Sequence, residues 1–257
     1  MIHPTALIDA SARIDEDVEI GPYTVIGPDV HISAGSVISS HVLINGPTRI
    51  GKNNRIYQFS SIGDATPDLK YKGEPTRLII GDNNTIREGV TIHRGTVQDN
   101  WETVIGDNNL LMSYVHIAHD CVVGSNTILV NNASLAGHVR VDDWAILSGY
   151  SLINQFSCIG AHSFVGMGSW IKFDVPAYVT VQGTPAEARG INVEGLRRRG
   201  FSTAQIKTIR QAFKLVYRRG LTLDEAIGEL ESQRSEHSEL GILIDSLRGS
   251  GSRGIVR

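Results

Sequence analysis

An aliphatic residue occupies every sixth position over most of this chain. The pattern runs from Ile2 to Ile62, from Ile80 to Ile92, and from Ile105 to Ile171. An α-helix has about 3.6 residues per turn, so residues six apart would spiral around it instead of lining one face. A period of six is typical of a hexapeptide parallel β-helix. The pattern therefore favours one long solenoid over a bundle of helices.

In a β-helix of this kind, each hexad forms one side of a triangular coil, and three hexads, about 18 residues, close the coil. The recurring aliphatic side chain points inward, and successive coils stack about 4.8 Å apart. The corners need unusual backbone angles, so we expect small residues, glycine or asparagine there. The alternative is a β-sandwich with chance spacing, and the unbroken run from Ile105 to Ile171 argues against it.

Two segments interrupt the repeat and have the composition of loops. They are residues 63–78, which read GDATPDLKYKGEPTRL, and residues 94–103, which read RGTVQDNWET. A solenoid accepts insertions at its corners, and these often lie on a binding face. We therefore expect both segments to protrude from the prism.

The period changes near residue 190, where a helical pattern begins. Ser202 is expected to cap a helix that stops at Gly220, Thr222 to cap a second helix, and residues 238–249 to form a third. The expected domains are a β-helix at 1–188 and a small helical domain at 189–257 that caps its end.

Composition and charge exclude several classes of protein. The chain has 257 residues, of which 41% are hydrophobic, and its net charge of −3 gives no general attraction to nucleic acid or anionic membranes. It has two cysteines and no apolar run long enough to span a bilayer. The N-terminus lacks the features of a signal peptide. We therefore expect a cytoplasmic protein without a disulfide framework.

The stretch HIAHD, residues 116–120, gathers titratable side chains within the third run. Adding 18 to a position moves one coil along the same side, so His119, Gly137 and Gln155 should stack about 5 Å apart. His138 follows Gly137 directly. A polar group is therefore expected on one side of an otherwise apolar prism.

Motifs longer than the hexads carry a family resemblance. They are NRIYQFSSIG, DLKYKGEPTR, VTIHRGTVQ, HIAHDC, LAGHVRVDD, INVEGLRRRGF and the terminal RGIVR. With these motifs the whole chain resembles the UDP-N-acetylglucosamine O-acyltransferases that begin lipid A synthesis in Gram-negative bacteria. The resemblance implies a mainly β fold, a left-handed parallel β-helix with a small C-terminal helical domain, assembled as a homotrimer with active sites between subunits.

The activity that the resemblance implies is transfer of an R-3-hydroxyacyl chain from acyl carrier protein to the 3-hydroxyl of UDP-N-acetylglucosamine. It implies no cofactor and no metal. His119 matches the general base, since an imidazole with a pKa of about 6.5 can take the hydroxyl proton and later give it to the leaving thiol. Asp120 would orient that imidazole. The Gly137 amide matches the donor to the oxyanion of the tetrahedral intermediate, and the stacking of His119 and Gly137 agrees with this role. The hydroxyl would attack directly, without an acyl-enzyme.

Further residues match the substrate-binding positions of the family. Asp68 and Lys70 are expected to contact the acceptor sugar, and Gln155 its diphosphate. His116 and His138 are expected to make further contacts to the nucleotide sugar. The implied ligands of the nucleotide and its phosphates are Asn192, Glu194, Arg198 and Arg199. Arginine suits phosphate through its planar fork of donors.

Two positions set this chain apart from some relatives. Asn154 stands where most members have histidine, and an amide cannot titrate, so we assign it no proton transfer. Met167 matches a variable position at the far end of the acyl groove, where members that accept longer chains have glycine. A methionine side chain would fill that end. We therefore expect a chain of the 3-hydroxydecanoyl class and not 3-hydroxymyristoyl.

The donor protein is acidic, and the main C-terminal helix carries a basic stripe that could receive it. The stripe consists of Arg210, Lys214, Arg218 and Arg219. The alternative is an ordinary solvated helix face.

Three other functions compete with acyl transfer to oxygen. A zinc carbonic anhydrase of the hexapeptide class would need three histidines from adjacent coils. The candidates are His93, His116, His119 and His138, although the spacing of the middle two does not match that family. The N-acyltransferase of the same pathway has an extra N-terminal domain, whereas this repeat starts at Ile2. A non-catalytic scaffold is the third competitor, and the stacked polar group argues against it.

Overall fold

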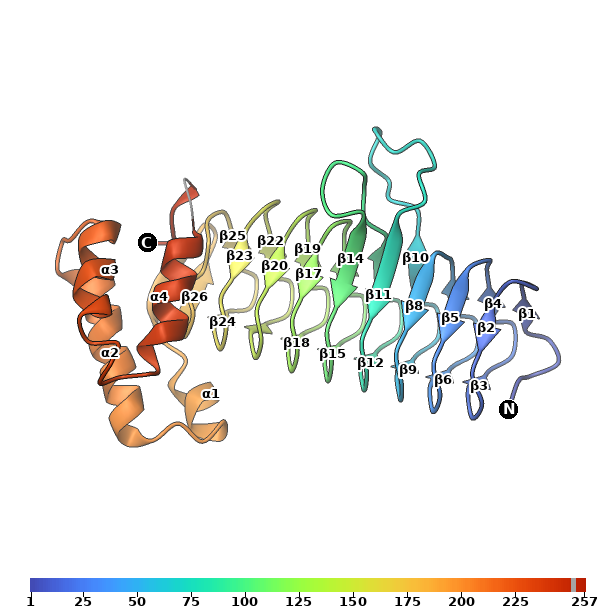
Figure 1. Ribbon diagram of the computed structural model, residues 1–257, viewed down its shortest axis with the longest axis horizontal. Helices are drawn as coiled ribbons and strands as arrows, with labels where there is room; N and C mark the ends of the chain where they lie inside the picture. The colour runs from blue at the N-terminus through green and yellow to red at the C-terminus, as the bar shows by residue number, and fades with distance from the viewer. Residues whose placement is uncertain (251–252) are drawn as a thin grey trace.

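The computed structural model describes residues 1–250 and 253–257 and shows a long three-sided prism with helices at one end (Figure 1). The chain visits three sheets in turn, so that along most of the prism each strand pairs in parallel with the strand three places on. Without an insertion, one return takes 18 residues, as where Leu7 pairs with Val25. The expected parallel β-helix is confirmed.

The three sides are named by their first strands. The first side contains β1 (Leu7–Ile8), β4 (Val25–Ile26), β7 (Leu43–Ile44), β10 (Ser61–Asp64), β13 (Thr91–His93), β16 (His116–Ile117), β19 (Ser134–Leu135), β22 (Leu152–Ile153) and β25 (Trp170–Ile171). The second side contains β2 (Arg13–Ile14), β5 (Val30–Ile32), β8 (Thr48–Ile50), β11 (Arg77–Ile80), β14 (Glu102–Ile105), β17 (Val122–Val123), β20 (Arg140–Val141) and β23 (Cys158–Ile159). The third side contains β3 (Glu19–Ile20), β6 (Val37–Ile38), β9 (Arg55–Ile56), β12 (Thr85–Ile86), β15 (Leu110–Leu111), β18 (Ile128–Leu129), β21 (Ile146–Leu147), β24 (Phe164–Val165), β26 (Val179–Gly183) and β27 (Ala186–Ile191).

The recurring aliphatic residues fill the interior of the prism. From Ile20 to Ile171 they are at most 3% exposed. Each such burial stabilises the fold by about 1.5–3 kcal/mol before entropy is counted. The first coil differs, since Ile2 is 48% exposed.

The corners differ from the expectation of small residues. Tyr114, Asp120, His138 and Phe156 have left-handed backbone angles, with φ between 58° and 63°. This conformation costs a residue with a Cβ about 1–2 kcal/mol. Stacking between coils offsets that cost, as where the rings of His138 and Phe156 lie 4.4 Å apart. The expectation is therefore too narrow, since aromatic and charged residues also occupy corners.

The loop segments leave the prism on one side, between β10 and β11 and between β13 and β14 (Figure 1). Arg94 joins their bases. Its backbone N–H donates to the Asp64 carbonyl at 3.1 Å. Its guanidinium donates to the Gly63 carbonyl at 3.0 Å and to the Tyr71 hydroxyl at 2.9 Å. Hydrogen bonds from Arg94 therefore hold the two loops together.

The C-terminal part begins with a hairpin. β27 pairs antiparallel with β26 and runs across residue 188, so the division of the chain there stays a prediction. The helices are α1 (Val193–Arg198), α2 (Thr203–Arg218), α3 (Leu223–Glu231) and α4 (Leu240–Gly249). Ser202 and Thr222 cap α2 and α3 through capping boxes, which confirms both predicted helix starts. α4 confirms the third predicted helix, whereas α1 was not predicted.

The helices pack into a second core that reaches the end of the prism. This core includes Tyr178, which is fully buried and donates its hydroxyl to the Glu239 carbonyl at 2.9 Å. Among the described residues, none of the helices has both the length and the apolar character needed to cross a bilayer.

Candidate active site

One corner of the prism, between the first and second sides, carries the polar group. His119 and Asp120 lie between β16 and β17, and Gly137 and His138 occupy the same corner one coil on. The His138 amide donates to the His119 carbonyl at 3.0 Å, and the Phe156 amide donates to the Gly137 carbonyl at 3.2 Å. The structure thus brings His119, Gly137 and Gln155 into the column that the 18-residue period predicts.

His119 lies directly against Gly137. A Cβ at position 137 would come within 2.5 Å of His119 Cε1 and 2.7 Å of Nε2, so only glycine fits beneath the ring in this position. In the described part of the chain, the Gly137 amide donates to no protein acceptor. The residue on which the His119 ring rests thus has an N–H without a protein acceptor in the described chain.

Asp120 holds the other nitrogen of the ring. The His119 Nδ1 donates to the Asp120 Oδ2 at 2.8 Å, because a carboxylate can only accept. The two residues are 8% and 2% exposed. Burial alone would raise the pKa of the Asp120 carboxyl, but hydrogen bonds from His119 and Thr96 together outweigh burial and lower that pKa. Asp120 therefore stays ionised behind the imidazole.

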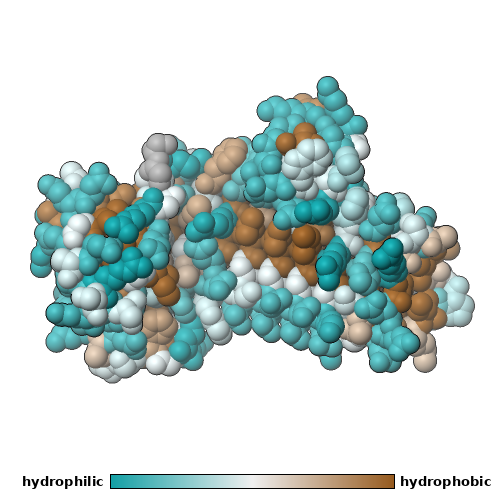
Figure 2. All heavy atoms as spheres, in the orientation of Figure 1, coloured by the Kyte–Doolittle hydropathy of each residue, from teal (hydrophilic) through white to brown (hydrophobic). Residues whose placement is uncertain are grey.

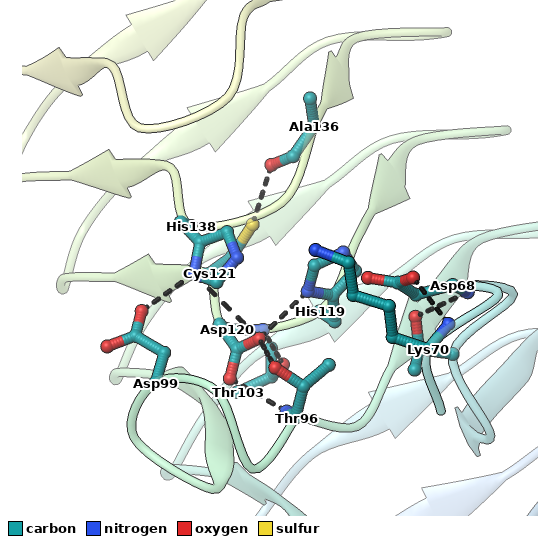
Figure 3. A network of polar contacts seen from close by, with 11 residues as sticks. Asp68, Lys70, Thr96, Asp99, Thr103, His119, Asp120, Cys121, Ala136 and His138 are labelled. Atoms are coloured by element: carbon teal, nitrogen blue, oxygen red, sulfur yellow. Dashed lines mark hydrogen bonds and ion pairs between the residues drawn. The ribbon is translucent and has the colours of Figure 1, made fainter. Parts of the chain in front are cut away.

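A second imidazole and carboxylate meet in the same corner. The His138 Nδ1 donates to the Asp99 Oδ2 at 2.7 Å. The ring of His138 stands edge-on to that of His119, with centroids 5.0 Å apart, and stacks on Phe156 from the next coil. Figure 3 shows the two pairs side by side, with Asp99 and Thr96 reaching in from one loop.

A cavity of about 500 Å³ opens over these groups. Its lining residues come from both loops and three coils. They are Asp68, Lys70, Thr96, Gln98, Asp99, His119, His138, Gln155 and Phe156. Asp68 accepts from the backbone N–H of Lys70 at 2.9 Å, and both side chains lie beside His119 (Figure 3).

His116 lies outside this lining. It is on β16, where its Nδ1 is 2.7 Å from the Thr91 hydroxyl and its ring meets that of His93 edge-on, with centroids 5.4 Å apart. Burial, followed by the nearby His93, lowers the pKa of His116. The imidazole is therefore neutral at pH 7.

The predicted nucleotide ligands lie around α1, also outside the lining. Asn192 caps this helix: its Oδ1 accepts from the Gly195 amide at 3.0 Å, and its Nδ2 donates to the His162 carbonyl at 3.0 Å. Arg199 donates to the His162 Nδ1 at 3.2 Å and lies over the Trp144 ring. Both side chains are thus already engaged within the chain.

Glu194 and Arg198 differ from these two residues in exposure. Arg198 is exposed near the end of α1. Glu194 is exposed in the first turn and pairs with Arg197 at 2.6 Å. Their side chains are open to solvent in this chain.

Asn154 and Met167 also lie outside the cavity lining. The Asn154 Oδ1 accepts from the Trp170 indole N–H at 3.2 Å. Met167 is 70% exposed at the corner between the third and first sides, flanked by Gly166 and Gly168.

His119, Asp120 and His138 also offer three ligand atoms that lie within 4.8 Å of one another. Three protein ligands suffice for a catalytic zinc site. However, Nδ1 of His119 and Oδ2 of Asp120 already bond to each other, which is the arrangement of a base and its orienting carboxylate. The geometry therefore suits proton transfer better than metal binding.

Sequence reasoning missed the contributions of Thr96, Gln98, Asp99 and Phe156 to this corner. The 18-residue period could have predicted Phe156, since this residue lies one coil after His138. The other three belong to a segment that breaks the period, so no arithmetic could place them.

Comparisons with known proteins identify the family of the chain. A family model described as UDP N-acetylglucosamine O-acyltransferase, domain 2, matches residues 174–256, and a bacterial transferase hexapeptide model matches residues 11–46 and 102–137. The chain is 62% identical to the acyl-(acyl-carrier-protein)-UDP-N-acetylglucosamine O-acyltransferase of Stutzerimonas stutzeri (strain A1501), over 100% of this chain and 99% of the relative.

Two solved structures are similar over the same extent. LpxA from Acinetobacter baumannii is 53% identical and UDP-N-acetylglucosamine O-acyltransferase from Moraxella catarrhalis is 50% identical, each with a TM-score of 0.97 and coverage of 100% of this chain and 99% of theirs. These matches confirm the left-handed parallel β-helix with a small C-terminal helical region. The chain is an acyltransferase and belongs to the UDP-N-acetylglucosamine O-acyltransferase family.

Proposed function

We propose that this protein transfers an R-3-hydroxyacyl chain from acyl carrier protein to the 3-hydroxyl of UDP-N-acetylglucosamine, in the first step of lipid A biosynthesis. The names of relatives that are similar over the full length of the chain support both substrates. The observation that carries the mechanism is the His119 and Asp120 pair, seated on Gly137 at the edge of a cavity.

His119 acts as the general base. Its Nδ1 proton is held by Asp120, so the lone pair on Nε2 is available to the cavity. The sugar hydroxyl oxygen attacks the thioester carbonyl carbon while Nε2 takes the hydroxyl proton. The carbon–sulfur bond then breaks as the oxyanion re-forms the carbonyl, and the proton passes from Nε2 to the departing thiolate, which leaves as the thiol. Such a base contributes about 100- to 10,000-fold to the rate.

Gly137 supplies the oxyanion donor. The carbonyl oxygen becomes negative in the tetrahedral intermediate and needs a fixed donor close to the base. The Gly137 amide lies beside His119 and is unused within the described chain. One glycine thus serves twice, since its missing Cβ also makes room for the imidazole.

Asp68, Lys70, His138 and Gln155 bind the acceptor from the walls of the cavity. His116 makes a further contact to the nucleotide sugar from outside that lining. The nucleotide and its phosphates are bound by Asn192, Glu194, Arg198 and Arg199, which also lie outside it. A homotrimer with sites between subunits accounts for this separation. Figure 2 shows an apolar band along the prism, and Ile79, Val104 and Val122 are half-buried neighbours on its second side. A second copy of the chain would cover such a band.

The acyl chain ends at Met167, which selects the 3-hydroxydecanoyl class over longer chains. The side chain is exposed in the single chain and free to project into a groove. The carrier protein docks on α2, where Arg210, Lys214 and Arg218 are exposed at helical spacing and Arg219 follows. We also propose that the protein works in the cytoplasm.

The decisive experiment is an acyl-transfer assay with UDP-N-acetylglucosamine and a panel of 3-hydroxyacyl carrier proteins. Wild type should form an O-acylated nucleotide sugar, and His119→Ala should lose about 100- to 10,000-fold in kcat. Met167→Gly should shift the preference toward longer chains. No transfer from any donor would reject the proposed activity, and unchanged selectivity of Met167→Gly would reject the role of that residue.

A further inference from the structure

Thr96, in the loop between β13 and β14, donates two hydrogen bonds to the carboxylate of Asp120. Its backbone N–H donates to Oδ1 at 2.8 Å, and its hydroxyl donates to Oδ2 at 2.6 Å. Thr96 is 2% exposed, so solvent cannot replace these donors. Oδ2 is the same oxygen that accepts from His119. Thr96 therefore fixes the plane of the carboxylate that orients the base.

Asp99 makes the matching contact to the second imidazole. Its Oδ2 accepts from the His138 Nδ1 at 2.7 Å. His138 Nδ1 is also 3.9 Å from the Asp120 Oδ2, so it lies close to both carboxylates. Asp99 thus keeps the two imidazoles on separate carboxylates.

The loop that carries both residues is itself held in place. The Trp101 N–H donates to the Thr96 carbonyl at 3.1 Å, and the Arg77 N–H donates to the Trp101 carbonyl at 2.9 Å. At its base, Arg94 ties it to the loop that carries Asp68 and Lys70. A loop with such anchors can impose a geometry on the corner below it.

We propose that the 94–103 segment is a positioning element of the active site, in which Thr96 orients the His119 and Asp120 pair and Asp99 orients His138. The inference rests on the proposed function and deepens it. Neither residue exchanges protons with substrate. Each acts through the imidazole or carboxylate that it holds, as outer partners of catalytic ligands do.

The test for Thr96 compares three variants. Thr96→Val removes the hydroxyl but keeps the backbone donor and the volume, and Thr96→Ser restores the hydroxyl. Thr127→Val is the matched control, because Thr127 is also buried and also donates both its N–H and its hydroxyl to one neighbouring side chain. In this case both bonds go to the Asn109 Oδ1, at 2.7 Å each, in a different corner.

Thr96→Val should lower kcat on the order of 10- to 100-fold with KM for the acceptor nearly unchanged, as for lost outer partners of other sites. Thr96→Ser should recover most of that loss, and Thr127→Val should leave both constants unchanged. Wild-type kcat in Thr96→Val, or no recovery in Thr96→Ser, would overturn the role of Thr96.

A spectroscopic measurement separates this inference from the proposed activity. In ¹⁵N-histidine-labelled protein, the Nδ1 proton of His119 should give a resolved, slowly exchanging NMR signal, because it is buried between His119 and Asp120. Thr96→Val should broaden or abolish that signal, whereas Thr96→Ser and Thr127→Val should keep it. If wild type transfers no acyl group, the proposed function fails while this signal still decides the role of Thr96. An unchanged signal in Thr96→Val overturns that role.

Asp99 is tested by Asp99→Ala and Asp99→Asn. Because His138 faces the cavity, both variants should raise KM for UDP-N-acetylglucosamine on the order of 10-fold, with a smaller change in kcat. Asp99→Asn keeps an acceptor and should retain more affinity than Asp99→Ala. An unchanged KM in both variants would overturn the role of Asp99.

Discussion

Two corners of the prism have the same type of backbone turn but differ in what their side chains do. Between the second and third sides, the side chains of Asn54, Asn84 and Asn109 each accept the backbone N–H of the next coil, at 2.7 to 2.9 Å. Between the first and second sides, His119 and His138 instead bond to carboxylates and face a cavity. The first of these corners is structural, because its side chains make the hydrogen bonds that join one coil to the next. The second corner is the candidate site, because its histidine side chains face a cavity instead.

The contrast is sharpest at Gly137. Gly137→Ala should displace the His119 ring, because the new Cβ would lie 2.5 Å from it, and kcat should fall by about 100- to 1,000-fold. The free energy of unfolding measured in urea should change little. Gly228→Ala is the control, since its Cβ would meet nothing within 4 Å. Near-wild-type kcat in Gly137→Ala would show that the contact between ring and glycine is not needed for turnover.

At the corner between the second and third sides, we expect a substitution to change stability and not kcat. Asn109→Ala leaves the Thr127 amide and the Gly124 carbonyl without their partners, so the free energy of unfolding should fall by about 1–3 kcal/mol. The kcat of the folded enzyme should stay constant. Urea denaturation of Asn109→Ala beside Asn131→Ala, an exposed asparagine at the third corner, checks this. Equal stability of the two variants would contradict a structural role for the asparagine column.

A smaller effect is expected from His162, which stands in the same corner as the asparagine column. Burial, followed by the neighbouring Arg199, lowers the pKa of His162 to about 4. The folded chain therefore keeps this imidazole neutral while the unfolded chain, with an ordinary pKa of about 6.5, takes up a proton. Stability should fall as the pH drops from about 6.5 to about 4.

The measurement is the free energy of unfolding across that pH range for wild type and His162→Gln. Glutamine keeps an acceptor for Arg199 but cannot titrate, so the variant should show a shallower slope. Other buried histidines leave some slope in both proteins. Parallel curves would contradict the assignment of this pH dependence to His162.

The repeat period explains why much of the site could be predicted. In a solenoid, residues 18 apart must stack, so the column of His119, Gly137 and Gln155 follows from counting. Thr96 and Asp99 could not be found this way, because they reach Asp120 and His138 across 24 and 39 residues from a loop outside the period. The hairpin of β26 with β27 and the short helix α1 were missed because both lie where one period ends before the next pattern begins.

The even stacking of coils has a consequence for chain length. Coils rise by about 4.8 Å, which is roughly the length of four methylene groups in an extended chain. That is about the difference between a 3-hydroxydecanoyl and a 3-hydroxymyristoyl group. If Met167 closes the acyl groove as proposed, a bulky side chain moved by one coil along its corner would change the preferred acyl chain by about four carbons.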